Sequence, residues 1–179
     1  MNVNVLPRMV RIHSSAPLSG TIIPPSSKYH TLRYILAAFL ARGMSTIYYP
    51  ATSDDTDMLL QACSHLGAHI HIESQTDERR ILSIRGTGGI LRTPPNSTID
   101  VGNAGAVLRL LLGICALSPE TITFTTPYPD SLGRRPNADL LQSLAQLGAT
   151  IEGHSVEGTL PIKIQGGQIH GGKTRIAGK

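Results

Sequence analysis

The sequence contains no tryptophan, and aromatic residues make up only 4% of its 179 residues, so its core has to be built mainly from aliphatic side chains. No apolar run approaches the roughly 18 residues that a membrane-spanning helix needs. The N-terminus lacks the apolar segment and small-residue cleavage site of a secretory signal peptide. No long basic run occurs, although the formal net charge is +4. We therefore expect no membrane and no nucleic-acid partner, while the modest positive charge suits small anionic molecules.

Cysteine is scarce: the sequence has only Cys63 and Cys115, each in an apolar stretch with helical periodicity. We interpret both as buried, reduced thiols of a cytoplasmic protein, because neither has the glycine-rich or basic neighbours that would stabilise a nucleophilic thiolate. His69 and His71 alternate on one predicted strand, but no third ligand follows at a recognisable spacing. The sequence therefore predicts no metal site.

What the sequence does contain is an internal repeat. The pattern LLQ followed by LGA occupies 59–68 and returns at 140–149. Short strands with similar residues are predicted at 21–23, 98–100 and 174–176, at spacings of 77 and 76 residues, and each is the lead-in strand that opens a repeat. We predict a first repeat at 21–97, a second repeat at 98–173 and the start of a third at 174–179.

Each repeat is predicted to run strand, helix, strand, helix and two further strands, an order written βαβαββ. The predicted helices cover 29–41, 56–66, 106–117 and 137–147. The remaining predicted strands cover 45–49, 68–72, 81–85, 121–125, 150–152 and 160–165. Asp54 or Asp55 is expected to cap the second helix, and Gly67 and Gly148 to end the second helix of each repeat. The fold class is thus α/β, built from the units of an α/β prism.

The third repeat is incomplete within the sequence. A repeat whose apolar face expects a neighbour is not stable without one. We therefore expect the chain to be the front portion of a longer polypeptide, or to have a partner chain that completes it.

Two loops before helices suit anions. Lys28 follows Pro24-Pro25-Ser26-Ser27 at the start of the first predicted helix, and Arg33 lies further along it. Free amides at a helix N-terminus attract anions, and an arginine can hold phosphate or carboxylate with two parallel hydrogen bonds. The alternative is an ordinary surface helix that carries a solvated lysine and arginine.

The second repeat has a matching loop, Gly102-Asn103-Ala104-Gly105, followed by Arg109 in the place of Arg33. Glycine lets a backbone approach a ligand closely, although tight packing alone can also demand these two glycines. Arg134-Arg135 lies just before the fourth predicted helix, where a cation is unfavourable for the helix dipole and a ligand would explain it. Otherwise this segment is only a turn formed by Asp130, Gly133 and Pro136.

Residues 167–174 match the nucleotide-binding pattern G-x-x-x-x-G-K-[ST]. That pattern needs a helix to begin at the lysine, whereas the repeat predicts a strand there. We interpret the glycines as a hairpin turn and keep nucleotide binding as a separate hypothesis.

These stretches together resemble one enzyme family. They are PPSSKYHTLRYILAAFLARG, SDDTDMLLQACSHLGA, DVGNAGAVLRLLLG, GRRPNADLLQSLAQLGATIE and LPIKIQGG. In this order they are similar to 3-phosphoshikimate 1-carboxyvinyltransferase, also called EPSP synthase, of the enolpyruvyl transferase superfamily. The UDP-N-acetylglucosamine enolpyruvyl transferases share the fold but carry a reactive cysteine loop near position 130, and PYPDSLGRRP has no cysteine.

The resemblance implies an inverse α/β barrel of two domains and six such units, with residues 1–20 contributing a strand segment to the other lobe. It also implies that the 5-hydroxyl of shikimate 3-phosphate attacks phosphoenolpyruvate in the cleft between the domains, and that the tetrahedral intermediate then loses phosphate. This is a step of aromatic amino acid biosynthesis, and it needs no metal or organic cofactor.

The same resemblance implies roles for particular residues. Shikimate 3-phosphate would contact Lys28, Tyr29 and Arg33. Phosphoenolpyruvate would contact Lys28, Gly105 and Arg135. Supporting roles would fall to Asn103, Arg109 and Asp55. The family's acid–base groups are expected beyond Lys179, so we expect this chain alone to be inactive.

The sequence departs from the family pattern at the anion loops. Ser26 or Ser27 replaces a glycine, Tyr29 a serine, Ala106 a threonine and Leu110 a proline. These changes leave open a divergent relative that uses another acceptor, or a non-catalytic anion-binding module.

Overall fold

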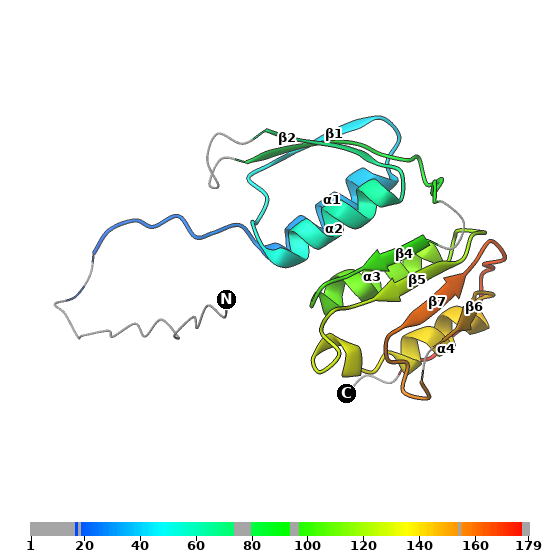
Figure 1. The fold of residues 1–179 in the computed structure, drawn as a ribbon. Coiled ribbons are helices and arrows are strands. Elements are labelled where there is room, and N and C mark those ends of the chain that lie inside the picture. Colours follow the sequence, from blue (N-terminus) through cyan, green and yellow to red (C-terminus); the bar gives the residue numbers. More distant parts are fainter. Residues whose placement is uncertain (1–16, 18, 74–79, 94–96, 154, 177–179) are drawn as a thin grey trace, which may run out of the picture.

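The structure is a computed structural model that describes residues 17, 19–73, 80–93, 97–153 and 155–176. It contains two α/β units, one after the other along the chain (Figure 1). The first unit comprises α1 (Lys28–Leu40), β1 (Met44–Tyr48), α2 (Asp54–His65), β2 (His69–Glu73) and β3 (Ile81–Arg85). The second comprises β4 (Ser97–Asp100), α3 (Gly105–Cys115), β5 (Ile122–Thr125), the short 3-10 helix η2 (Leu132–Arg134), α4 (Ala138–Gln146), β6 (Thr150–Glu152) and β7 (Ile162–Gln165). The second unit therefore has the predicted βαβαββ order.

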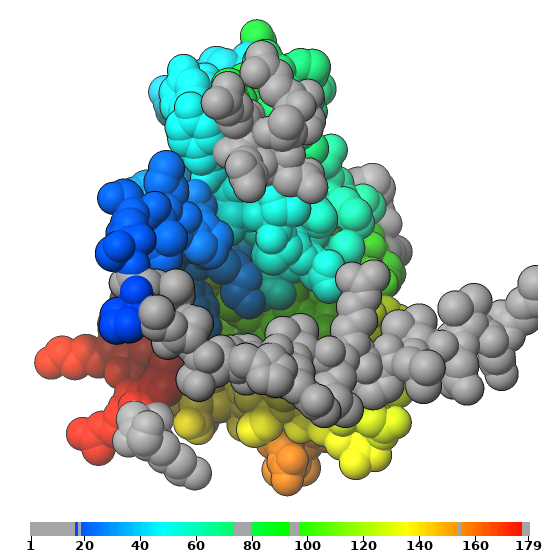
Figure 2. Space-filling model, turned by 90° about the vertical axis from the view of Figure 1, so that its left-hand side faces the viewer, coloured from blue at the N-terminus to red at the C-terminus, as the bar shows by residue number. Residues whose placement is uncertain are grey.

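The two sheets share a common plan. The first has the order β1-β3-β2 with antiparallel neighbours. The second has the order β4-β5-β7-β6, in which β4 and β5 are parallel and the other pairs antiparallel. Helices α1 and α2 pack on the first sheet, and α2 also contacts α3 and β4 of the second unit. Figure 2 shows the first unit, largely in cyan, above the second, in green and yellow.

Two predicted lead-in strands are absent from the described residues. Residues 21–23 form no strand, and Ile22 and Ile23 are 88% and 94% exposed. Thr21 and Ile22 match Thr98 and Ile99 of β4, but Pro24 and Pro25 follow and have no N–H to donate to a ladder. Residues 174–176 also form no strand; here the Thr174 hydroxyl bonds the side chains of Ser143 and Gln146, which ties this segment to α4.

The helices begin and end near their predicted limits, and local hydrogen bonds explain the differences. Ser53, rather than Asp54 or Asp55, caps α2 by accepting from the backbone N–H of Thr56 at 3.3 Å. Both aspartates instead lie in the first turn, where their charge favours the helix dipole. Gly67 and Gly148 follow α2 and α4 at φ values of +103° and +109°, as the predicted glycine ends require.

The core is mainly aliphatic, and its two phenylalanines, Phe39 and Phe124, are fully buried. Helix α3 illustrates why the sequence folds in this way: its buried residues recur at helical spacing and form one apolar face. Cys63 and Cys115 are buried free thiols, as predicted. Burial raises the pKa of Cys63 to about 12 and that of Cys115 further still.

One pair of glycines marks the same close contact in both units. Gly86 follows β3, and a Cβ atom there would lie 2.3 Å from the carbonyl oxygens of Ala38 and Ala41. Gly166 follows β7, and a Cβ atom there would lie 1.5 Å from the carbonyl oxygen of Ala116. In each unit, therefore, the backbone that follows the last strand packs directly against the C-terminal end of the first helix.

Among the residues described, no helix has both the length and the apolar character needed to cross a membrane.

Candidate anion-binding site

The site in the second unit begins with a loop that is held in one conformation. The Asp100 side chain accepts a hydrogen bond from the backbone N–H of Gly102 at 2.7 Å, and the Thr126 hydroxyl donates to the Gly102 carbonyl at 2.5 Å. Gly102 has a φ of +55°, a conformation that glycine adopts without strain. These contacts fix the backbone between β4 and α3.

Helix α3 then begins without a side-chain cap. Ala104 occupies the capping position, and the first turn of the helix contains no acidic residue. The first amides of a helix have no partner inside the helix and carry the positive end of its dipole. The start of α3 therefore offers donors and positive potential to an anion.

Two guanidinium groups converge on this helix start. A Cβ atom at Gly105 would lie 3.0 Å from Nη1 of Arg135 and 3.4 Å from Nη1 of Arg109. Arg109 comes from α3 itself, whereas Arg135 comes from the segment between η2 and α4. No ion pair joins either arginine to an acidic side chain in the described part of the chain. The absence of a side chain at residue 105 thus gives both cations room beside the backbone.

The start of α1 is arranged differently. Ser27 caps it, with its hydroxyl accepting from the His30 N–H at 3.4 Å. The Lys28 ammonium lies 3.1 Å from a carboxylate oxygen of Asp55 and 5.8 Å from the centre of the Tyr29 ring. Arg33 donates to the carbonyl of Tyr29 at 2.9 Å. Here Lys28 is already paired with Asp55, and Tyr29 beside it is 62% exposed.

The structure thus gathers the predicted residues into two groups. Gly105, Arg109 and Arg135 form one, and Lys28, Tyr29, Arg33 and Asp55 form the other. Helices α1 and α3 begin on the same side of the molecule, where η2 also lies (Figure 1). Asn103 is exposed in the loop before α3. Arg134 does not join the first group, since it pairs with Asp130.

One residue of the site was missed by the sequence analysis. The side-chain oxygen of Asn137 accepts a hydrogen bond from Nε of Arg109 at 3.1 Å. Asn137 immediately precedes α4, where asparagine ordinarily signals a helix cap. Nothing in the sequence links it to Arg109, 28 residues earlier.

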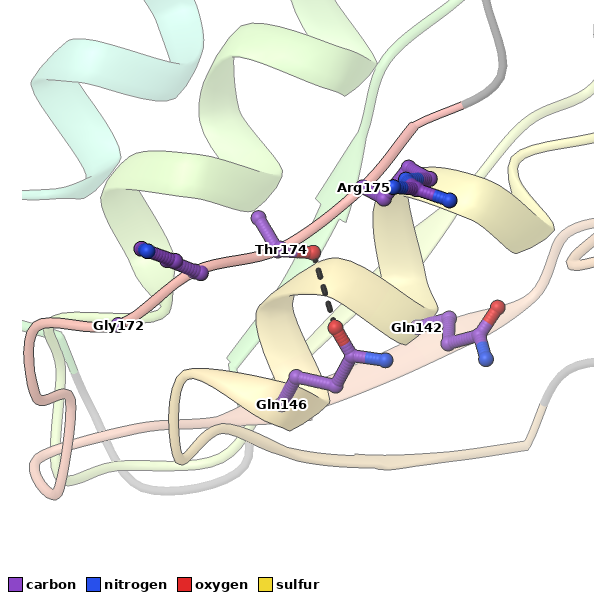
Figure 3. A pocket seen from close by; sticks show the side chains of 6 residues that line it. Gln142, Gln146, Gly172, Thr174 and Arg175 are labelled. Carbon is purple, nitrogen blue, oxygen red and sulfur yellow. Dashed lines mark hydrogen bonds between the residues drawn. The ribbon is translucent and has the colours of Figure 1, made fainter.

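The segment that matches a nucleotide loop has a different structure. No helix begins at Lys173 in the described residues, and residues 172–175 run along α4. They line a hollow of about 830 Å³ together with Gln142 and Gln146, and Thr174 points to Gln146 there (Figure 3). Without a helix N-terminus to receive phosphate, this segment is not a phosphate-binding loop.

Metal ligands do not cluster in the described ranges. No group of three or more histidine, cysteine, aspartate or glutamate side chains is close enough there to hold an ion. The His71 ring lies 4.0 Å from a carboxylate oxygen of Glu73.

The chain is similar to proteins of known function along nearly all its length. Residues 12–179 match the family model for EPSP synthase (3-phosphoshikimate 1-carboxyvinyltransferase). The 3-phosphoshikimate 1-carboxyvinyltransferase of Deinococcus radiodurans is 39% identical over 168 residues, which cover 94% of this chain and 36% of that protein. The protein of the same name from Methanosphaera stadtmanae is 38% identical over 161 residues, 90% of this chain and 36% of the relative.

A solved structure agrees with this assignment. The EPSP synthase of Acinetobacter baumannii superposes with a TM-score of 0.72 at 29% identity, covering 83% of this chain and 32% of that one. The chain spans about a third of the length of the relatives that it matches. On the family model and the shared fold together, the chain belongs to the EPSP synthase family.

Proposed function

We propose that this chain supplies substrate-binding groups for the transfer of the carboxyvinyl group of phosphoenolpyruvate to the 5-hydroxyl of shikimate 3-phosphate. In this reaction the hydroxyl oxygen bonds to C2 of phosphoenolpyruvate while C3 gains a proton. Loss of inorganic phosphate and of a C3 proton then restores the double bond. Both substrates carry several negative charges, so fixed cations and oriented amides are the groups that the reaction needs from the protein.

The observation that carries the proposal is the pair of guanidinium groups at the uncapped start of α3. Nη1 of Arg135 and Nη1 of Arg109 lie 3.0 and 3.4 Å from the position of a Cβ at Gly105. Neither arginine is paired with an acidic side chain among the described residues. An anion there gains charge-assisted hydrogen bonds together with the helix dipole. We assign this group to phosphoenolpyruvate.

The start of α1 suits the second substrate. Lys28 holds a full charge next to the phenol of Tyr29, and Arg33 lies within the next turn. We assign Lys28, Tyr29 and Arg33 to shikimate 3-phosphate, and we assign Lys28 also to phosphoenolpyruvate. Asp55 limits the free charge of Lys28 until an anion arrives, because the two side chains are 3.1 Å apart.

The experiment is turnover by a polypeptide that contains this chain and the full length of the family fold. Release of inorganic phosphate from phosphoenolpyruvate is measured with and without shikimate 3-phosphate. We expect release to require both substrates and to fall at least about a hundredfold in Arg135→Ala or Lys28→Ala, since each change removes a charged hydrogen-bond partner. Arg134→Ala is the matched control and retains activity, because Arg134 is exposed and bonded to Asp130. Unchanged turnover in Arg135→Ala would contradict the assignment.

A second function is favoured by two positions. Tyr29 and Ala106 replace smaller or polar residues of the family pattern at both anion loops. The bulk of Tyr29 beside Lys28 then selects a different anionic acceptor, or the chain binds anions without transferring the carboxyvinyl group. Calorimetry separates the two functions. Binding of shikimate 3-phosphate supports the transferase, and its absence at millimolar ligand, with phosphoenolpyruvate still bound, supports the divergent relative.

A further inference from the structure

Asn137 occupies an unusual position for a polar side chain. It lies immediately before α4, and only 5% of its surface is exposed. At this position an asparagine side chain ordinarily accepts a hydrogen bond from an amide in the first turn of the helix. In this structure it makes no such bond. The carboxamide is directed elsewhere, and the helix start loses its side-chain cap as a result.

The carboxamide instead makes three hydrogen bonds. Its nitrogen donates to the carbonyl of Arg135 at 2.9 Å and to the carbonyl of Gly158 at 3.0 Å. Its oxygen accepts from Nε of Arg109 at 3.1 Å. Reversing the amide would place its oxygen against two carbonyl oxygens and its nitrogen against a guanidinium donor, so only one orientation satisfies all three partners.

These bonds join the two arginines of the site. The Asn137 side chain accepts a hydrogen bond from the guanidinium of Arg109 and donates one to the main-chain carbonyl of Arg135. Its third bond goes to the carbonyl of Gly158, and the Asn137 backbone N–H donates to the carbonyl of Glu157 at 3.0 Å. The network therefore sets the relative placement of two cations whose Nη1 atoms both lie close to Gly105.

We propose that Asn137 is a positioning residue for the anion site, which it serves by fixing the direction in which Arg109 presents its donors. Because Asn137 occupies Nε of Arg109, the anion is bound through the terminal Nη1 and Nη2 groups rather than through the side-on pair that includes Nε. A neutral amide does this without cancelling the positive charge of Arg109, as an aspartate at residue 137 would. This inference rests on the proposed function, because it takes phosphoenolpyruvate as the anion.

A double-mutant cycle on the full chain tests the proposal, with phosphoenolpyruvate as the calorimetric probe. We expect Asn137→Ala to raise the dissociation constant about tenfold, as the loss of one bond to a charged group implies. In an Arg109→Ala background the same substitution should change the dissociation constant by less than about twofold, because the partner that it positions is gone. An undiminished effect of Asn137→Ala in that background would overturn the proposal, since the residue would then act through the fold alone.

A second measurement requires no substitution and no ligand. In the free chain, the Nε–H of Arg109 should exchange with water more slowly than the Nε–H of Arg135, which makes no hydrogen bond to the described residues. Nuclear magnetic resonance of the arginine side chains measures both rates. Equally fast exchange would overturn the proposal even if Asn137→Ala failed to fold.

The two measurements also separate the two proposals. If the wild-type polypeptide with the full length of the family fold binds no phosphoenolpyruvate, the proposed function fails, while slow exchange at Arg109 still establishes the contact with Asn137. If the anion binds but Arg109 is not protected, the function survives and the positioning role is wrong.

Discussion

The two units of this chain share a scaffold but begin their first helices in different ways. Helix α1 is capped by Ser27, and its cation, Lys28, is paired with Asp55. Helix α3 has no side-chain cap, and two arginines lie beside its first residue without acidic partners in the described ranges. Away from these starts the units agree, because Gly67 and Gly148 end equivalent helices and Gly86 and Gly166 make equivalent close contacts.

The difference separates positions that maintain the fold from positions that bind ligand. A repeated fold preserves the contacts that it needs in every copy, such as a glycine against a helix end. A helix start that satisfies its own amides and charges, as α1 does, has less to offer an anion. A start that leaves them unsatisfied, as α3 does, is less stable without a ligand and stronger as a binding site. We therefore place the stronger anion site at α3.

The largest effect is expected where the two units are most alike. Gly166→Ala forces a Cβ to within 1.5 Å of the Ala116 carbonyl oxygen, and Gly86→Ala forces one to within 2.3 Å of the Ala38 carbonyl oxygen. Each should lower the free energy of unfolding by about 3 kcal/mol or more, measured by urea denaturation. Gly113→Ala is the matched control: nothing lies within 4 Å of its Cβ position, and alanine favours a helix. Equal stability of all three variants would show that Gly86 and Gly166 do not pack closely against the helix ends.

A smaller effect is expected at the site itself. In Gly105→Ala, the new methyl group lies 3.0 Å from Nη1 of Arg135 and displaces that guanidinium or the bound anion. We expect the affinity for phosphoenolpyruvate to fall about tenfold, as for the loss of one charged hydrogen bond. The melting temperature should stay the same or rise, because alanine replaces glycine in the first turn of a helix. A fall in stability with unchanged affinity would contradict this, because Gly105 would then serve the fold and not the anion site.

At the start of α1 the expected change is smaller again. The Lys28 and Asp55 side chains are 40% and 22% exposed, so water screens much of their attraction. Asp55→Asn should lower the free energy of unfolding by less than about 1 kcal/mol, and less at high salt than at low salt. Denaturation at two salt concentrations measures this. A large effect that is independent of salt would mean that the pair is structural.

Ionisation of the two buried thiols should have no effect on stability at neutral pH. Cys63 lies on α2 and Cys115 on α3, and burial raises the pKa of both, that of Cys63 from 9.0 to about 12. Because the thiols ionise at lower pH in the unfolded chain, their contribution to the free energy of unfolding is constant below pH 9 and falls as the pH rises from 9 towards 12. Replacement of both thiols by alanine should remove this alkaline loss. Rapid alkylation of the native chain at pH 8 would contradict their burial.

The sequence predicted the second unit well because its pattern and its packing agree. Strand β6 has its predicted limits, and β4 and α3 each start one residue before their predicted starts. The segment at 21–23 begins with the same Thr-Ile pair as 98–99 of β4 but forms no strand, because a matching sequence does not supply a pairing partner. Cys63 and Cys115 were assigned correctly to the core, because burial, unlike strand pairing, can be predicted from apolar neighbours in the sequence.

The sequence pointed to the cations of the candidate site and to its loops, but not to the contacts between their side chains. Repetition pointed to Arg109 and the loop before it, and the unfavourable place of Arg135 before α4 pointed to a ligand. The contact of Asn137 with Arg109 joins residues that are far apart in the sequence, so no local pattern reports it. The pairing of Lys28 with Asp55 was likewise visible only in three dimensions.

The central claim is that an anion binds at the start of α3 between Arg109 and Arg135. Titration of the chain with phosphoenolpyruvate, followed by nuclear magnetic resonance of backbone amides and arginine side chains, tests it most directly. We predict that the largest shifts fall on Gly105, Ala106 and the guanidinium groups of Arg109 and Arg135, and that Arg135→Ala removes them. Shifts centred on Lys173 and Arg175, or no shifts at millimolar ligand, would contradict the claim.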